Sequence, residues 1–404
     1  PSSVVPVWPA EFKLHADFPH DIRPLEGPVT KRVEILEQWE PDPDRLQVAV
    51  VNYEATWRME QALVTWKPDM IICDESQRIK TSSTRQSKAM HCLGRIAKYR
   101  LILTGTPITQ GPLDLFSQYK FLDPAIFGNS YYAFRARYAI MGGYENRQVI
   151  GYKNLPELIQ KAHQVAFRVT KAEALDLPEY TDQVLYCDLE RKANALYQQL
   201  AKESVAELSE EKVLTVANVL TRLLRLSQVT GGFLGDGEGE IYQVSRSKLK
   251  LLEEILDDLL DAGKKAVIFA RFLPEIRAIK KLLDKKGVGY AWITGEVKQE
   301  ARGDEVRWFQ EDPECRVFVA QIQTAGLGIT LTAADTAIFY SLDFSYANLD
   351  QAKARLHRIG QRNAVTNIYL LARGTVDEKI FAVLQEKKSV ADMIVDGWRD
   401  FFEN

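Results

Sequence analysis

The chain has few cysteines, and their spacing does not suit a metal site or a disulfide framework. Only Cys73, Cys92, Cys187 and Cys315 occur among 404 residues, and they lie far apart. A structural zinc site needs paired cysteines or histidines a few residues from one another. The four residues therefore indicate buried or free thiols in a reducing compartment, either the cytoplasm of a bacterial or virus-infected cell or the nucleus of a eukaryotic one.

Long apolar runs and an excess of positive charge are also missing. No apolar run approaches the ~20 residues of a membrane-spanning helix, and no secretory or transit segment is present, so we predict no membrane partner. The formal net charge of −3 argues against binding nucleic acid by bulk positive charge. A basic groove on a near-neutral protein stays possible. Hydrophobic residues make up 46% of the chain, which is enough for substantial cores.

Short apolar runs alternate with helical patterns in both halves of the chain, which is typical of parallel α/β sheets. The length fits two domains. We predict a first domain at 1–178 with a helical protrusion at about 112–171, and a second at 179–404 with a helical insertion at about 190–245. The predicted strands are 46–51, 70–73, 101–103, 184–188, 266–270, 290–294, 316–320, 336–340 and 366–371.

An acidic pair, Asp74 and Glu75, directly follows the predicted strand 70–73. In a nucleotide hydrolase, one such carboxylate holds hydrated Mg²⁺ and the other accepts a proton from the attacking water. Acidic residues at a strand end are more often helix caps or surface acids, so the pair alone does not decide the matter.

Two small-residue turns follow later strands. Thr104-Gly105-Thr106-Pro107 makes a rigid turn, either a plain turn or a relay between a nucleotide site and a nucleic-acid track. In Thr324-Ala-Gly326-Leu-Gly328-Ile-Thr330, the two glycines allow backbone amides to approach a phosphate closely. The third glycine of a dinucleotide-binding fingerprint is absent.

Arg355 and Arg358 lie near the end of the chain in Gln351-Ala-Lys-Ala-Arg-Leu-His-Arg-Ile-Gly-Gln361. We predict a helix over 349–357, which places both guanidiniums on one face with Gln351 about one further turn back. A planar, permanently charged fork suits the negative charge that develops during phosphoryl transfer. The alternative is a solvated basic helix that ends at Gly360.

Taken in order, these strings resemble the superfamily-two helicase-related ATPases of the Swi/Snf type. The resemblance runs almost end to end and is carried by 74–80, 103–107, 267–272, 324–331 and 351–361. It implies an α/β fold with two RecA-like parallel-sheet domains in tandem and with helical insertions. It also implies an ATP-dependent translocase that moves on double-stranded DNA.

The resemblance further implies the roles of single residues. Asp74 would bind Mg²⁺, Glu75 would activate water, and Arg355 and Arg358 would reach across an interdomain cleft to the γ-phosphate of ATP. Gln77 stands where many members have His and others have Gln. The implied ATP-binding residues are Asp74, Glu75, Gly326, Gly328, Gln351, Arg355 and Arg358; the DNA contacts are Asn52, Thr104 and Thr324; the coupling residues are Gln77, Thr104, Gly105 and Thr106.

One family element is absent from these residues. No Gly-x-x-x-x-Gly-Lys-Ser/Thr string occurs, and Gly263-Lys264-Lys265 lacks both the first glycine and the hydroxyl. That loop supplies the lysine and the backbone amides that hold the β- and γ-phosphates. We therefore expect the first domain to be incomplete at its N-terminus, with the loop supplied by an upstream segment or by another subunit.

Three functions stay open on the sequence alone. The first is the ATP-driven translocase on duplex DNA. The second is a non-catalytic DNA-binding fragment or subunit without the phosphate-binding loop. The third is a translocase subunit of a restriction or repair assembly whose nuclease lies elsewhere, since nothing in this sequence resembles a nuclease centre.

Overall fold

The computed structural model describes residues 2–143, 148–169, 171–210, 216–235 and 240–395. The chain divides into two compact units, Pro1–Thr170 together with Lys387–Asn404, and Lys171–Glu386. The division falls a few residues before the predicted boundary at 178. Among the described residues, no helix combines the length and the apolar character needed to cross a membrane.

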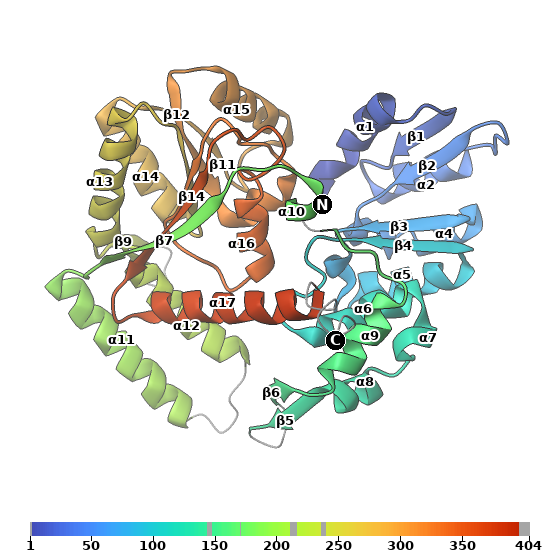
Figure 1. Ribbon diagram of the computed structural model, residues 1–404, viewed down its shortest axis with the longest axis horizontal. Helices are drawn as coiled ribbons and strands as arrows, with labels where there is room; N and C mark the ends of the chain where they lie inside the picture. Colours follow the sequence, from blue (N-terminus) through green and yellow to red (C-terminus); the bar gives the residue numbers. More distant parts are fainter. Residues whose placement is uncertain (1, 144–147, 170, 211–215, 236–239, 396–404) are drawn as a thin grey trace. The chain divides into compact units, whose positions relative to one another are not determined.

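The second unit is built on a six-stranded parallel sheet in the order β11-β12-β10-β13-β14-β7 (Figure 1). Its strands are β7 (Tyr180–Cys187), β10 (Ala266–Ala270), β11 (Gly289–Ile293), β12 (Cys315–Gln321), β13 (Thr336–Phe339) and β14 (Val365–Ala372). Its helices are α10 (Lys171–Ala174), α11 (Arg191–Glu210), α12 (Val216–Thr230), α13 (Ser247–Asp261), α14 (Leu273–Lys286), α15 (Gln299–Glu311), the 3-10 helix η5 (Ile322–Leu327), α16 (Tyr346–Lys353) and the part of α17 (Val376–Val395) that precedes Lys387.

Helices cover both faces of this sheet, which is why a central strand such as β10 reads as an unbroken apolar run. Helices α13 and α14 pack on the face that carries Ile268, Val319 and Leu370. The other face carries a row of stacked rings, with Phe269 5.3 Å from Phe339 and Phe339 5.0 Å from Tyr369 between ring centroids. The ring of Phe381, on α17, packs against Tyr369 with 4.9 Å between the ring centroids. The predicted α/β architecture is confirmed in this unit.

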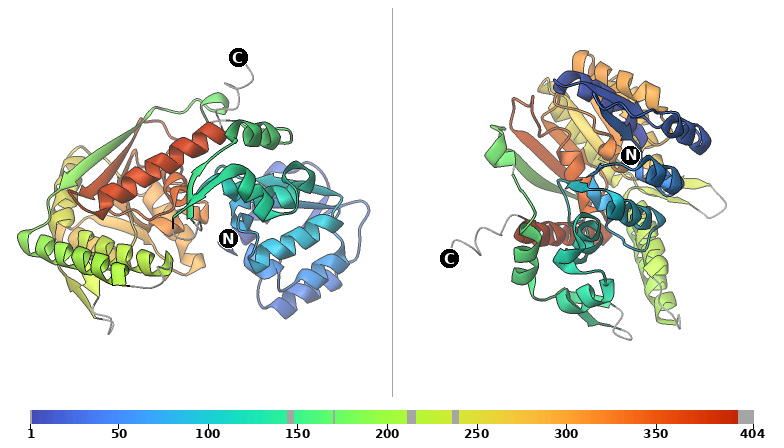
Figure 2. Two further views of the ribbon diagram at one scale, coloured as in Figure 1. Left: turned by 90° about the horizontal axis from the view of Figure 1, so that it is seen from below. Right: turned by 90° about the vertical axis from the view of Figure 1, so that its right-hand side faces the viewer.

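The predicted helical insertion at 190–245 contains more than helices. Helices α11 and α12 pack along each other (Figure 2), and an antiparallel hairpin of β8 (Phe233–Gly235) and β9 (Ile241–Gln243) follows them. The hairpin gives no periodic apolar signal in the sequence because its strands have only three residues each.

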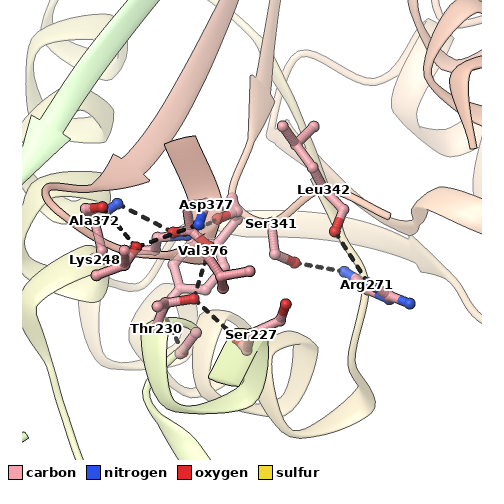
Figure 3. A network of polar contacts seen from close by, with 12 residues as sticks. Ser227, Thr230, Lys248, Arg271, Ser341, Leu342, Ala372, Val376 and Asp377 are labelled. Carbon is pink, nitrogen blue, oxygen red and sulfur yellow. Dashed lines mark hydrogen bonds and ion pairs between the residues drawn. The ribbon is translucent and has the colours of Figure 1, made fainter. Parts of the chain in front are cut away.

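A buried ion pair links α13 to the start of α17, and Thr230 of the insertion bonds to it. The Lys248 ammonium lies 2.6 Å from a carboxylate oxygen of Asp377 (Figure 3). It also donates to the backbone carbonyl of Tyr340 at 3.1 Å. The Asp377 carboxylate also accepts from the Thr230 hydroxyl and from the Ala372 amide. Because two charges without water need such partners, the network ties α12, α13 and the β14–α17 turn to one another.

The first unit has smaller sheets. Parallel β1 (His20–Pro24) pairs with β2 (Leu46–Val50), and parallel β3 (Met70–Asp74) pairs with β4 (Tyr99–Leu103). Its helices are η1 (Ser2–Val7), α1 (Trp8–His15), α2 (Val29–Glu37), α3 (Tyr53–Thr56), α4 (Glu60–Trp66), η2 (Ser76–Ile79), α5 (Arg85–Ile96), η3 (Pro112–Asp114), α6 (Leu115–Leu122), α7 (Pro124–Phe127), α8 (Tyr131–Tyr138) and α9 (Leu155–His163).

Two elements of the first unit were not predicted. Strand β1 has the polar sequence His-Asp-Ile-Arg-Pro, so no apolar run marks it. The protrusion predicted as helical at 112–171 also holds an antiparallel hairpin of β5 (Ala139–Gly142) and β6 (Gln148–Tyr152). Helices α6, α8 and α9 do form there, around a cluster of aromatic rings that includes Phe116 and Phe134.

Candidate functional site

The acidic pair lies where strand β3 ends and η2 begins. Asp74 is the last residue of β3, beside Leu103, the last residue of β4. Glu75 follows with φ 52° and ψ 53°, in the left-handed region. A residue with a Cβ pays roughly 1–2 kcal/mol for this conformation, so surrounding contacts must hold it. Backbone strain of this kind is frequent at functional sites.

A chain of hydrogen bonds runs from Glu75 to the turn after β4. The Gln77 side-chain amide donates to a Glu75 carboxylate oxygen at 2.6 Å, and the Thr104 hydroxyl donates to the Gln77 carbonyl oxygen at 2.8 Å. The Thr106 backbone N–H in turn donates to the Thr104 hydroxyl oxygen at 3.0 Å. The structure thus brings together three residues predicted for coupling and the predicted base. Gly105, between the two threonines, has open space where a Cβ would lie.

The electrostatics of the pair favour a cation. Withdrawal of Asp74 from water raises the pKa of its carboxyl, and the neighbouring Glu75 carboxylate raises it further. A divalent cation would relieve both effects. Among the described residues, no group of three or more His, Cys, Asp or Glu side chains could hold a metal ion. One or two carboxylate oxygens with no further protein ligand suit Mg²⁺, which keeps several waters and binds substrate phosphates.

Asn52, a predicted DNA contact, is held by charged neighbours. Its side-chain oxygen accepts from the Arg32 guanidinium at 2.8 Å, and its amide donates to the Glu54 carboxylate at 3.0 Å. The Arg78 guanidinium lies 3.8 Å from the other Glu54 oxygen. The side chain is half-buried, so a fixed, partly exposed amide with two arginines nearby is available at this surface.

Tyr53 connects this group to the acidic pair. Its hydroxyl donates to the backbone carbonyl of Asp74 at 2.8 Å, across 21 residues of sequence. That carbonyl belongs to the peptide that leads into Glu75. A hydrogen bond of this type stabilises by about 0.5–1.5 kcal/mol, similar to the cost of the left-handed residue that follows.

In the second unit, the structure corrects the predicted position of the two arginines on a helix. Helix α16 ends at Lys353, and Arg355 and Arg358 lie in the turn that follows it. Both guanidiniums nevertheless converge on one group, the backbone carbonyl of Ile329, at 3.5 Å and 3.3 Å. Arg355 also donates to the backbone carbonyl of Gln351 at 3.1 Å. A long-range backbone contact, not a helical face, therefore places the two arginines together.

The glycine-containing turn is thereby joined to the arginines. Ile329 follows Gly328, whose φ of 75° is left-handed and favours glycine. Gly326 lies within η5. Thr324 is buried, and its hydroxyl donates to the backbone carbonyl of Gln321 at 2.6 Å. Thr324 is a predicted DNA contact, but in this structure its side chain is buried and bonded within the protein.

Gln361 fixes the end of the arginine turn. Its buried side-chain amide donates to the backbone carbonyl of Ala334 at 2.8 Å, and its oxygen accepts from the N–H groups of Arg362 and Asn363. This role of Gln361 was not predicted from the sequence. The contacts of Arg32 and Tyr53 were not predicted either, because their partners lie about 20 residues away and leave no local pattern.

Two family models match the chain. The SNF2-related domain matches residues 1–231, and the helicase conserved C-terminal domain matches residues 247–360. The second match begins at Ser247, the first residue of α13.

Several curated proteins are similar over most of this chain. The chromodomain-helicase-DNA-binding protein 1-like of Danio rerio is 29% identical over 388 residues, which cover 92% of this chain and 36% of that protein. A Caenorhabditis elegans homologue of the SWI/SNF-related matrix-associated actin-dependent regulator of chromatin subfamily A-like protein 1 is 30% identical over 379 residues, which cover 91% of this chain and 52% of that protein. The chain thus spans about a third to a half of the length of these relatives.

Among solved structures, the Sulfolobus solfataricus SWI2/SNF2 ATPase core in complex with dsDNA is 28% identical. The match covers 98% of this chain and 81% of that one, with a TM-score of 0.45.

Proposed function

The chain belongs to the SNF2-related family, and from that premise we propose that it is the motor portion of a DNA-dependent ATPase that moves along double-stranded DNA. The observation that carries the proposal is the hydrogen-bond chain Glu75–Gln77–Thr104 beside Asp74. It joins an acidic strand end, where a water could be activated, to the turn of the neighbouring strand.

In the proposed reaction, each unit supplies different chemistry. Asp74 holds Mg²⁺, and Glu75 accepts the proton of the water that attacks the γ-phosphate of ATP. Arg355, Arg358 and the backbone of Gly326 and Gly328 stabilise the phosphate charge, with Gln351 beside them. Asn52, Thr104 and Thr324 contact the DNA backbone.

We propose that the phosphate-binding loop is supplied by a segment outside these 404 residues, in the same polypeptide or in another chain. An apolar sheet face supports this proposal. Tyr99, Leu101 and Leu103 of β4 are 38–54% exposed, and Met70 and Ile72 of β3 lie beside them at 47% and 53%. Parallel sheets are normally covered on both faces. We propose that a strand–loop–helix segment covers this face and brings its loop to the strand end at Asp74.

The 404-residue chain itself provides the test. We expect it to bind a duplex DNA fragment weakly, with an affinity that falls as salt rises. We expect no DNA-stimulated ATP hydrolysis above background, whereas the same chain joined to a loop-bearing segment hydrolyses ATP. Loss of all DNA binding at low salt would contradict the proposed function, and robust hydrolysis by the 404 residues alone would contradict the argument from the missing loop.

The second candidate is a DNA-binding fragment or subunit that hydrolyses no ATP, because the loop is absent from these residues. It predicts DNA binding that stays unchanged on addition of Mg-ATP, even when a loop-bearing segment is present. The titration of DNA with and without Mg-ATP separates the two candidates.

A further inference from the structure

The side chain of Tyr53 connects the segment around Asn52 to the strand end that carries Asp74 and Glu75. It is the first residue of α3, directly after Asn52, and its hydroxyl reaches the Asp74 carbonyl at 2.8 Å. Both residues belong to the first unit, so the connection lies within one compact body.

The peptide that Tyr53 holds controls the orientation of Glu75. A carbonyl fixed by the tyrosine hydroxyl cannot rotate freely, and rotation of the Asp74–Glu75 peptide is what would release Glu75 from its left-handed conformation. The next turn depends on the same residue, because the Arg78 N–H donates to the Glu75 carbonyl at 3.0 Å. The Gln77 contact to the Glu75 carboxylate requires this orientation as well.

The other end of the connection is also fixed. Arg32 and Glu54 hold the Asn52 side chain, so a ligand that moves Asn52 moves the start of α3 with it.

We propose that Tyr53 is a positioning residue that transmits duplex DNA binding at Asn52 to the conformation of Glu75, the predicted catalytic base. The proposal rests on the proposed function, since it takes duplex DNA as the ligand at Asn52 and Glu75 as the base. When DNA holds α3, the tyrosine hydroxyl holds the Asp74 carbonyl more firmly, and Glu75 spends more time in the orientation that Gln77 stabilises.

The test is hydrogen exchange of the 404-residue chain, read by mass spectrometry in peptides that cover 74–80, with and without a duplex DNA fragment. In the wild type, we expect DNA to slow exchange in these peptides by about threefold to tenfold. In Tyr53→Phe, which keeps the ring and loses only the hydroxyl, we expect faster exchange without DNA and little slowing with it.

Tyr119→Phe is the matched control. The Tyr119 hydroxyl also donates to a backbone carbonyl in the same unit, that of Ala162 at 2.9 Å, which belongs to α9 and not to the acidic strand end. This variant should keep the wild-type response to DNA at 74–80.

The possible failures are distinguishable. If the wild type does not bind DNA, the proposed function fails before the inference is reached. If DNA binds and slows exchange at 74–80 equally in the wild type and in Tyr53→Phe, the role of Tyr53 is overturned. Equal effects of Tyr53→Phe and Tyr119→Phe would also overturn it, because they would indicate a general loss of stability.

Discussion

Replacing Lys248 by methionine tests whether the second unit depends on its buried ion pair. The Lys248 side chain is 1% exposed and that of Asp377 is 9% exposed, with 2.6 Å between ammonium and carboxylate. Methionine keeps most of the volume and removes the charge. The Asp377 carboxylate then stays buried with only two neutral donors, from Thr230 and Ala372.

The expected cost follows from that unpaired charge. Removal of one partner of a buried ion pair destabilises by about 3–5 kcal/mol, which is a large part of the 5–15 kcal/mol of a typical domain. Asp377→Asn should cost a similar amount. The double variant Lys248→Met with Asp377→Asn should cost clearly less than the sum of the two, because no unpaired charge remains.

Hydrogen exchange in peptides from β10 and β14 measures the effect within the second unit, since the amides of these buried strands exchange by cooperative opening. Lys250→Met is the control. Lys250 lies two residues further along α13 and pairs with Glu190 at 3.3 Å, but its side chain is 61% exposed. We expect the control to change the opening free energy by less than about 0.5 kcal/mol. Equal effects of Lys248→Met and Lys250→Met would refute the argument.

Three further predictions concern the site and the pH dependence of stability. In the protein that includes the phosphate-binding loop, Glu75→Gln should keep Mg-ATP binding and abolish hydrolysis, because the metal ligand Asp74 is intact; calorimetric titration showing lost binding would contradict this division of roles. In the same protein, Arg355→Ala and Arg358→Ala should each lower DNA-stimulated hydrolysis by about 10³-fold with little change in DNA affinity, and unaltered turnover in either would exclude its role. Burial raises the pKa of Glu275 from its ordinary 4.5 to about 7, so the folded chain keeps a proton that the unfolded chain loses between these values. Stability should therefore fall by about 3 kcal/mol as pH rises through that window, and urea unfolding of Glu275→Gln should lack this part of the pH dependence.

Much of the second unit could be predicted from the sequence because both faces of its sheet are buried. Runs such as Ala266–Ala270 are apolar at every position, and a strand covered on both sides gives that pattern whatever its neighbours are. Strand β1 could not be predicted in this way, since its polar residues are only half-buried and its pairing with β2 comes from a segment more than 20 residues away.

The chemical groups of the candidate site could be identified from local sequence alone. The order of the acidic pair, the small-residue turns and the two arginines is a local property of the chain, and it indicated the family before any fold was known. The assignment of Asp74 to a strand end was likewise local, because an apolar run leads directly into it.

The way in which those groups are held depends on contacts between distant segments. Helix α16 ends at Lys353. The backbone carbonyl of Arg355 accepts a hydrogen bond from the Leu331 N–H at 2.9 Å, so a distant segment replaces the helical hydrogen bond that local spacing predicts. Nothing in the sequence around Lys248 distinguishes it from an exposed lysine on a helix. Its burial depends on the ion pair with Asp377, 129 positions later in the chain. In both cases the energy comes from partners remote in sequence, and their proximity exists only once the sheet has formed.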